Sequence, residues 1–189
     1  MKGLLQAADQ LQAFFLKHDW PFCFIGGLAV LRWGEPRLTQ DIDVSLLTGF
    51  GQERRFASIL VERYRPRISD AVEFAAQRRV LLLESAEGYG IDIALAALPF
   101  EQLLIRQASL FEFLPQLALR TCSAEDLLVL KAFSNRPKDQ QDLIGIVARQ
   151  RSKLDWAYIE AQLQPLLELK DDASILTNLR RLRQDWAAR

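Results

Sequence analysis

The chain has 189 residues, of which 50% are hydrophobic, and this is enough for one sizeable core or for a catalytic domain with a small helical extension. Lys plus Arg and Asp plus Glu each number 24, so the net charge of zero provides no global field for indiscriminate binding to nucleic acid. The N-terminal stretch contains no long apolar run, which excludes a membrane span there and argues against a signal peptide. We expect a cytoplasmic protein with no membrane contact.

The first part of the chain predicts a helix, a strand and a glycine-opened turn. Residues 3–17 carry apolar side chains at helical spacing, which predicts an amphipathic helix packed on a sheet. The apolar stretch 22–25 predicts a short strand, and Gly26 and Gly27 open a predicted helix over 28–33. Glycines let a ligand approach the backbone, and the first turn of a helix has N–H groups that attract anions. This turn is therefore a candidate phosphate site.

The next predicted strand carries two acids, Asp41 and Asp43, between apolar residues. Residues i and i+2 of a strand point to the same side, with Cα atoms roughly 6.5 Å apart, so the two carboxylates converge while Ile42 and Val44 face the opposite layer. Like charges this close repel unless water or a cation satisfies them, and Mg²⁺ binds carboxylate oxygens. The pair indicates a metal site, although an acid pair alone also fits an ordinary exposed strand end.

The middle of the chain predicts a helix and a hairpin. Helical spacing resumes over 52–64, and the stretch 54–79 is rich in arginine, which fits a phosphate-binding patch or simply solvated faces. Residues 79–84 and 91–95 predict two hairpin strands around a glycine-containing turn. The second of these strands carries Asp92. If it pairs with the strand of the first two acids, a third carboxylate reaches the same edge; otherwise Asp92 is a buried structural acid.

The last third of the chain is mostly helical. Residues 99–105 predict a helix and 117–121 a short edge strand. Ser123, followed by two acids, predicts a helix N-terminus. That helix carries Lys131 among apolar residues, where an amine must reach solvent, pair with an acid or bind an anion such as a triphosphate. Two further amphipathic helices are predicted from residue 155 onward.

These motifs together resemble a known family. A hydrophobic residue before Gly26-Gly27, thirteen intervening residues and then Asp-hydrophobic-Asp-hydrophobic resemble the signature of the nucleotidyltransferase superfamily related to DNA polymerase beta. The run from Arg37 to Asp43, with Thr39 and Asp41 inside it, is similar to that of the AbiEii-like branch of minimal nucleotidyltransferases. The stretches 125–131 and 136–143 resemble the later motif of the family, in which one helix brings a lysine toward the nucleotide and a second helix opens with Lys-Asp and a further Asp. The roles of that second helix's residues stay open at this point; they are Lys138, Asp139 and Asp142.

The resemblance implies a fold, a reaction and a set of residues. The fold is α/β, a nucleotidyltransferase fold whose mixed β-sheet is flanked by helices in residues 1–120, with a helical lobe in residues 121–189. The reaction is the Mg²⁺-dependent transfer of a nucleoside monophosphate from a nucleoside triphosphate (NTP) to an acceptor hydroxyl, with one or two Mg²⁺ ions. The implied catalytic acids and metal ligands are Asp41, Asp43 and Asp92, with Asp92 completing a second metal site or acting as base. The implied nucleotide-binding residues are Gly26, Gly27, Arg37, Thr39 and Lys131.

The acceptor is less narrowly defined than the reaction. The family includes toxin components of toxin–antitoxin pairs, so the resemblance implies RNA such as tRNA, or protein, as acceptor and an antitoxin as a candidate partner. The same layout is similar to that of aminoglycoside and lincosamide nucleotidyltransferases, which makes a small-molecule antibiotic the alternative acceptor. A third alternative is a nucleotide-binding or antitoxin-binding module without catalysis, against which the three acids argue. The sequence specifies neither the base of the NTP nor the oligomeric state.

Overall fold

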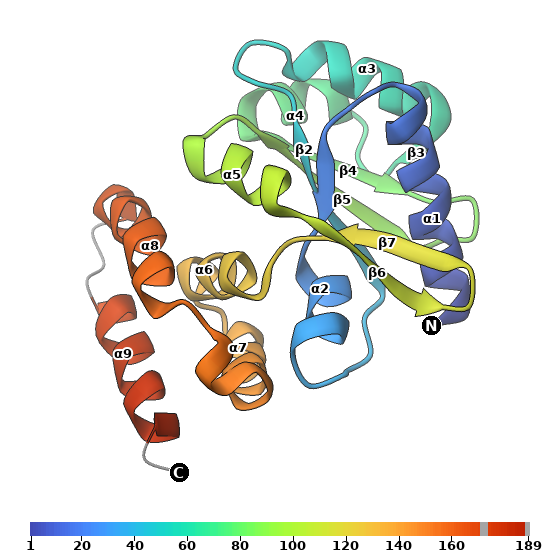
Figure 1. Ribbon diagram of the computed structural model, residues 1–189. Helices are drawn as coiled ribbons and strands as arrows, with labels where there is room; N and C mark the ends of the chain where they lie inside the picture. Colours follow the sequence, from blue (N-terminus) through green and yellow to red (C-terminus); the bar gives the residue numbers. More distant parts are fainter. Residues whose placement is uncertain (171–173, 188–189) are drawn as a thin grey trace. The chain divides into compact units, whose positions relative to one another are not determined.

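The computed structural model describes residues 1–170 and 174–187, and its elements are labelled in Figure 1. Contacts divide the chain into two compact units. The first consists of Met1–Leu28 and Leu38–Cys122, and the second of Ala29–Arg37 and the residues from Ser123 onward. The predicted helical lobe also includes residues 171–173 and 188–189, which lie outside the described residues.

The first unit is α/β. Within the described residues it holds a seven-stranded sheet in the order β3-β4-β5-β2-β1-β7-β6, mixed because the β2/β5 and β1/β7 pairs are parallel and the others antiparallel. The strands are β1 (Phe22–Phe24), β2 (Asp41–Leu47), β3 (Arg65–Pro66), β4 (Val80–Glu84), β5 (Gly90–Ala96), β6 (Ser109–Leu114) and β7 (Leu117–Thr121). The helices are α1 (Lys2–Lys17), α3 (Glu53–Arg63), α4 (Ala71–Arg78), α5 (Pro99–Gln107) and the start of α2 (Gly26–Trp33).

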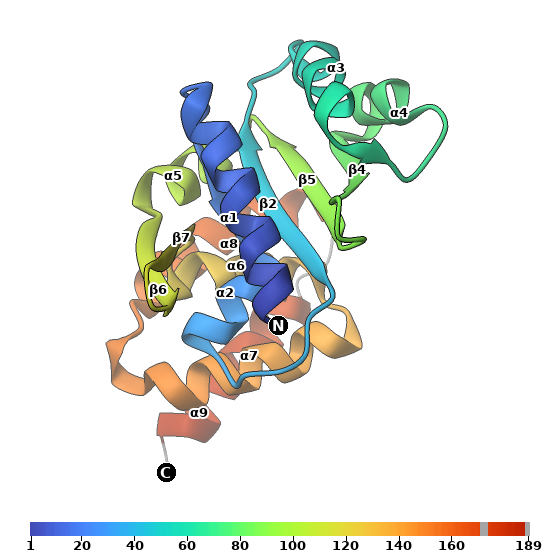
Figure 2. The same cartoon turned by 90° about the vertical axis from the view of Figure 1, so that its right-hand side faces the viewer.

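The alternation along β2 separates an apolar face of the sheet from an acidic one. Ile42, Val44 and Leu46 are fully buried. Phe22 pairs with Leu46 across the β1/β2 ladder and lies 4.9 Å, between ring centroids, from Phe15 of α1. Helix α1 therefore covers the apolar face, and Figure 2 shows it lying across β2. Because strand side chains alternate, the acids at the start of β2 point to the opposite face.

Most of the predicted elements of this unit are confirmed; one assignment is wrong, and three short elements, β3, α4 and β6, were not predicted. The predicted hairpin is the β4/β5 pair. The segment 117–121 is a strand as predicted, but the edge assignment is wrong, because β7 lies between β1 and β6. The edge strand is β6, for which the sequence predicts no strand; four of its six residues are exposed, so no apolar alternation marks it. Helix α4 was not predicted either, since it is short and only two of its residues are buried.

The second unit is helical. It consists of α6 (Ala124–Ser134), α7 (Pro137–Gln150), a short 3₁₀ turn, η1 (Arg151–Lys153), α8 (Trp156–Lys170) and α9 (Ser174–Ala187), with the end of α2. Ser123 caps α6 as predicted, since its Oγ accepts a hydrogen bond from the N–H of Asp126 at 3.0 Å. The end of α2 is tied to α7, because Gln150 Nε2 donates to the carbonyl of Trp33 at 2.7 Å. Among the described residues of both units, none of the helices combines the length and apolar character that a membrane crossing requires.

Candidate active site

Three aspartates lie on one face of the sheet where β2 and β5 run side by side in the first unit. In this parallel ladder Asp43 is directly opposite Asp92, and Asp41 is opposite Gly90. The pairing expected between these strands is therefore confirmed. Residues directly opposite each other share a face of the sheet, so all three acids belong to the face opposite α1. Asp41 is exposed, Asp43 is partly buried, and the side chain of Asp92 is 37% exposed.

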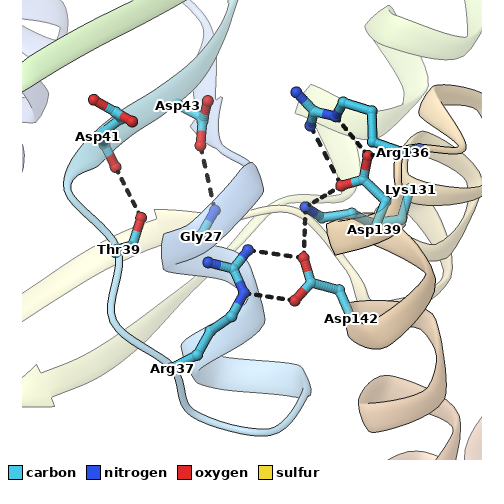
Figure 3. A network of polar contacts seen from close by, with 9 residues as sticks. All are labelled: Gly27, Arg37, Thr39, Asp41, Asp43, Lys131, Arg136, Asp139 and Asp142. Carbon is cyan, nitrogen blue, oxygen red and sulfur yellow. Dashed lines mark hydrogen bonds and ion pairs between the residues drawn. The ribbon is translucent and has the colours of Figure 1, made fainter.

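The first turn of α2 holds Asp43 in place. The backbone N–H of Gly27 donates to Oδ2 of Asp43 at 3.3 Å (Figure 3), and the N–H of Ile25 donates to the carbonyl of the same residue at 3.0 Å. A carboxylate at a helix N-terminus is stabilised by the helix dipole. The N–H group predicted to contact a phosphate thus contacts a carboxylate in this structure, and the turn acts first as a support for the acid.

The two glycines of the turn are required by close packing. A Cβ atom on Gly26 would lie 2.0 Å from Oδ2 of Asp43, and one on Gly27 would lie 2.2 Å from Oγ1 of Thr39. Gly26 also has φ +54°, a conformation that side-chain-bearing residues rarely adopt. Thr39 is buried, and its hydroxyl donates to the carbonyl of Asp41 at 3.3 Å. The sequence motif therefore builds a turn in which glycines make room for the acid and the threonine.

Gly26→Ala is expected to destabilise the protein by about 2 to 4 kcal/mol. The left-handed backbone conformation accounts for about 1 kcal/mol of this loss, and the displacement of Asp43 accounts for the rest. Gly51→Ala is the matched control, since Gly51 has φ +79° and a Cβ there would meet nothing within 4 Å. Urea unfolding of both variants measures the difference. Equal losses of stability would show that Asp43 moves aside without cost.

Asp92 has an unusual electrostatic environment. Burial raises the pKa of its carboxyl above the ordinary value, and the neighbouring charges of Asp43 and Asp41 add to this effect, while Arg67 opposes it without cancelling it. Arg67 donates through Nη2 to Oδ1 of Asp92. Arg67 cannot be singled out from the sequence, because it is one of several arginines in the stretch 54–79 and nothing local distinguishes it.

Two of the three aspartates are arranged to bind a hard divalent cation such as Mg²⁺. In the described part of the chain, no group of three or more His, Cys, Asp or Glu side chains is assembled to hold a metal ion. Mg²⁺, however, keeps several waters and usually takes only one or two carboxylates together with substrate phosphates. Asp41 and Asp43, two residues apart on one face, supply that many, whereas Asp92 is engaged with Arg67. The donor set therefore fits a Mg²⁺ ion completed by a polyphosphate.

Two other predicted site residues, Arg37 and Lys131, take part in an ionic network of the second unit (Figure 3). Arg37 donates Nε and Nη2 to the two carboxylate oxygens of Asp142 at 2.6 and 2.8 Å. Lys131 Nζ lies 2.8 Å from a carboxylate oxygen of Asp142 and 2.8 Å from one of Asp139. Arg136 Nε donates to the other oxygen of Asp139 at 2.7 Å. Lys131 thus pairs with acids, the alternative that the sequence left open, and its contact with a nucleotide stays a prediction.

Burial makes this network stronger than a surface cluster. The side chains of Lys131, Asp139 and Asp142 are 5%, 0% and 2% exposed. Burial alone raises the pKa of each carboxyl, but the hydrogen bonds from Arg136 and Lys131 to Asp139, and from Arg37 and Lys131 to Asp142, outweigh it and hold both pKa values below the ordinary range. Both acids are therefore ionised and stabilise the fold at neutral pH.

Four of the seven arginines in the stretch 54–79 form ion pairs with acids. Side chains of Arg54, Arg65, Arg67 and Arg79 pair with Glu73, Glu84, Asp92 and Glu53 respectively, all within the first unit. For these four arginines the interpretation as a phosphate-binding patch is weakened, because their guanidinium groups are neutralised by the protein's own acids. The pairs do not bear on Arg55, Arg63 and Arg78.

Comparison with known proteins identifies the fold. No family model matches the chain, and a search of curated proteins finds no match. An antigenic nucleotidyltransferase-like protein from Paracoccidioides brasiliensis matches with a TM-score of 0.54 and 14% identity, over 94% of this chain and 92% of that chain. The antibiotic-resistance factor ANT(2'')-Ia, in its solution structure, matches with a TM-score of 0.50 and 16% identity, over 99% and 92%. The protein described here has the nucleotidyltransferase fold, as the sequence motifs implied.

Proposed function

We propose that the protein is a Mg²⁺-dependent nucleotidyltransferase that moves a nucleoside monophosphate from an NTP to an acceptor hydroxyl and releases pyrophosphate. The observation that carries this proposal is that Asp41, Asp43 and Asp92 lie on one face of the neighbouring strands β2 and β5, beside a glycine turn, in a nucleotidyltransferase fold. In a site of this kind the carboxylates bind a cation, and the positive charge of the cation also balances the negative charge of a triphosphate. A purely structural role would not require three acids on one face.

In this proposal Asp41 and Asp43 hold Mg²⁺, and Gly26 and Gly27 keep Asp43 in position. When bound, the metal supplies Lewis-acid stabilisation of the charge that develops on the phosphates. The carboxylate of Asp43 accepts a hydrogen bond from the N–H of Gly27, and its main-chain carbonyl accepts one from the N–H of Ile25, so the side chain needs little rearrangement to bind a cation. Thr39, which packs against the turn, and Arg37 and Lys131 of the second unit are the remaining nucleotide-binding candidates.

Asp92 is proposed as the group that accepts the proton of the attacking hydroxyl. Its pKa is raised by burial and by the neighbouring acids, which makes it a stronger base than an ordinary aspartate. Asp92→Asn is expected to leave NTP binding largely intact and to slow transfer by about 10² to 10⁴-fold, the usual effect of losing a positioned base. Single-turnover transfer from a labelled NTP measures the rate, and binding calorimetry measures the affinity.

The matched control for Asp92 is Glu84→Gln on the neighbouring strand β4. Glu84 pairs with Arg65 at 3.1 Å and lies opposite Gly90 in the β4/β5 ladder, so the variant removes one charge from the same sheet. It should transfer at the parental rate. A parental rate for Asp92→Asn, with an unchanged melting temperature, would rule out the base assignment.

The acceptor separates two candidate functions. An RNA such as tRNA, or a protein, modified within a toxin–antitoxin pair, is the function that the sequence resemblance implies; the antitoxin partner and the cytoplasmic location stay predictions. A small-molecule antibiotic is supported by the likeness to an antibiotic-resistance factor and by the pairing of four of the seven arginines of 54–79 with acids, which leaves less charge for RNA. Labelled NTPs offered with Mg²⁺ to total tRNA, to a protein extract and to a panel of aminoglycosides and lincosamides discriminate between them. Label on none of these acceptors would contradict the proposed reaction.

A further inference from the structure

The position of Arg67 beside the acids has no explanation in the proposed reaction. Arg67 lies in the first unit, between β3 and α4, and its backbone N–H donates to the carbonyl of Leu82 on β4 at 3.0 Å. Leu82 is the direct neighbour of Asp92 in the β4/β5 ladder. The backbone of Arg67 is thus fixed one strand away from the acid that its side chain contacts.

The guanidinium of Arg67 lies over the same glycine as Asp41. A Cβ on Gly90 would lie 2.4 Å from Oδ1 of Asp41 and 3.2 Å from Nη1 of Arg67, so both side chains pass across this position. Nη2 meanwhile contacts Asp92. One nitrogen of the guanidinium is thus bound to Asp92 while the other lies near Asp41. The positive charge of Arg67 therefore lies where a divalent cation shared by these acids would place its own.

We propose that Arg67 is the internal counter-ion of Asp92 and competes with metal ions for its carboxylate. In the metal-free protein Arg67 neutralises Asp92, and a cation that uses Asp92 must first displace the guanidinium. The pair is able to open, because its side chains are 32% and 37% exposed and solvent-exposed ion pairs are weak. Arg67 acts through Asp92 and is therefore a positioning residue. The inference rests on the proposed function only in placing a metal at Asp41 and Asp43, and it adds that a cation bound there also draws on the carboxylate of Asp92.

The test is Mn²⁺ binding to the full chain, without nucleotide, followed by the electron paramagnetic resonance signal of the free ion. Arg67→Gln is expected to bind Mn²⁺ about three- to tenfold more tightly than the parent, since a competing charge is removed. Arg67→Lys keeps the charge but loses the planar fork, and should stay within about twofold of the parent. In an Asp92→Asn background, Arg67→Gln should give no gain, because the carboxylate for which the two cations compete is absent.

Arg65→Gln is the matched control. It removes the same charge two positions away, but the partner of Arg65 is Glu84 on β4. Its Mn²⁺ affinity should equal that of the parent; a gain as large as that of Arg67→Gln would mean that net charge alone is responsible and would overturn the inference. A gain that persists in the Asp92→Asn background would overturn it as well.

Three outcomes of the Mn²⁺ titration bear differently on the inference and on the proposed function. A parent that binds Mn²⁺ and an Arg67→Gln variant that binds it no more tightly would refute the counter-ion role and leave the metal assignment standing. Binding by neither protein would refute both. A parent that binds no Mn²⁺ while Arg67→Gln binds it would support the inference in its strongest form. Melting temperatures of all variants, measured without metal, establish that each is folded.

Discussion

Asp43→Asn is expected to abolish Mg²⁺-dependent NTP binding and to lower the transfer rate by about 10² to 10⁴-fold, the size of effect that follows when several kcal/mol of metal-assisted charge stabilisation are lost. The amide still accepts the hydrogen bond from Gly27, so the turn of α2 should keep its conformation. The melting temperature should be unchanged or higher, because the substitution relieves repulsion with Asp41 and Asp92. Calorimetric titration of Mg²⁺ and NTP, with thermal melting, measures both effects.

The control for this substitution is Asp70→Asn, which makes the same chemical change at an exposed aspartate before α4 whose side chain makes no capping hydrogen bond. Binding and melting of this variant should match the parent. An Asp43→Asn protein that still binds Mg²⁺ and NTP with parental affinity would contradict the metal site and, with it, the proposed reaction.

Lys131→Met is expected to destabilise the protein by about 3 to 5 kcal/mol, the usual cost of removing one partner from a buried ion pair. The variant leaves Asp139 and Asp142 buried with one cation fewer between them, while the methionine side chain occupies a similar volume. Lys138→Met, on the same helix as both acids, is the control, because Lys138 is exposed and its loss should cost less than about 0.5 kcal/mol. Urea unfolding at pH 7 compares the two.

The pH dependence of this effect has a definite sign. The folded-state pKa values of Asp139 and Asp142 lie below their unfolded value of about 3.9, so their contribution is present above that pH and is lost as pH falls toward the folded pKa values. The free energy of unfolding of the parent should therefore decrease below about pH 5, and that of Lys131→Met should decrease less. The gap between the two proteins should narrow in acid; a gap that is constant from pH 7 to pH 3 would show that the network does not depend on ionised carboxylates.

These measurements also separate two interpretations of Lys131. A lysine that contacts phosphate contributes to NTP affinity, whereas a lysine that only holds Asp139 and Asp142 contributes to stability. NTP affinity of Lys131→Met, measured well below its melting temperature, decides between them. A parental affinity would assign the residue to the fold of the second unit alone.

The acid motif was predictable from the sequence because its signal is local. The alternation of Ile42 and Val44 with Asp41 and Asp43 determines which face of a strand each side chain takes, and a period of two residues needs no knowledge of the neighbouring strands. The glycine pair before it, the helix of residues 3–17 and the 79–95 hairpin are set in the same way by spacing and turn chemistry. The α/β class follows from these elements.

Only the tertiary structure decided which groups meet. Asp43 lies opposite Asp92 because β2 and β5 are parallel neighbours, and no local pattern in either strand specifies this register. Strand β7 is an interior strand because the exposed strand β6 pairs with its outer side. The partners of Lys131 and Arg67 come from other elements. An ion pair depends on distances across the fold, whereas sequence periodicity indicates only which side of its own helix or strand a residue faces.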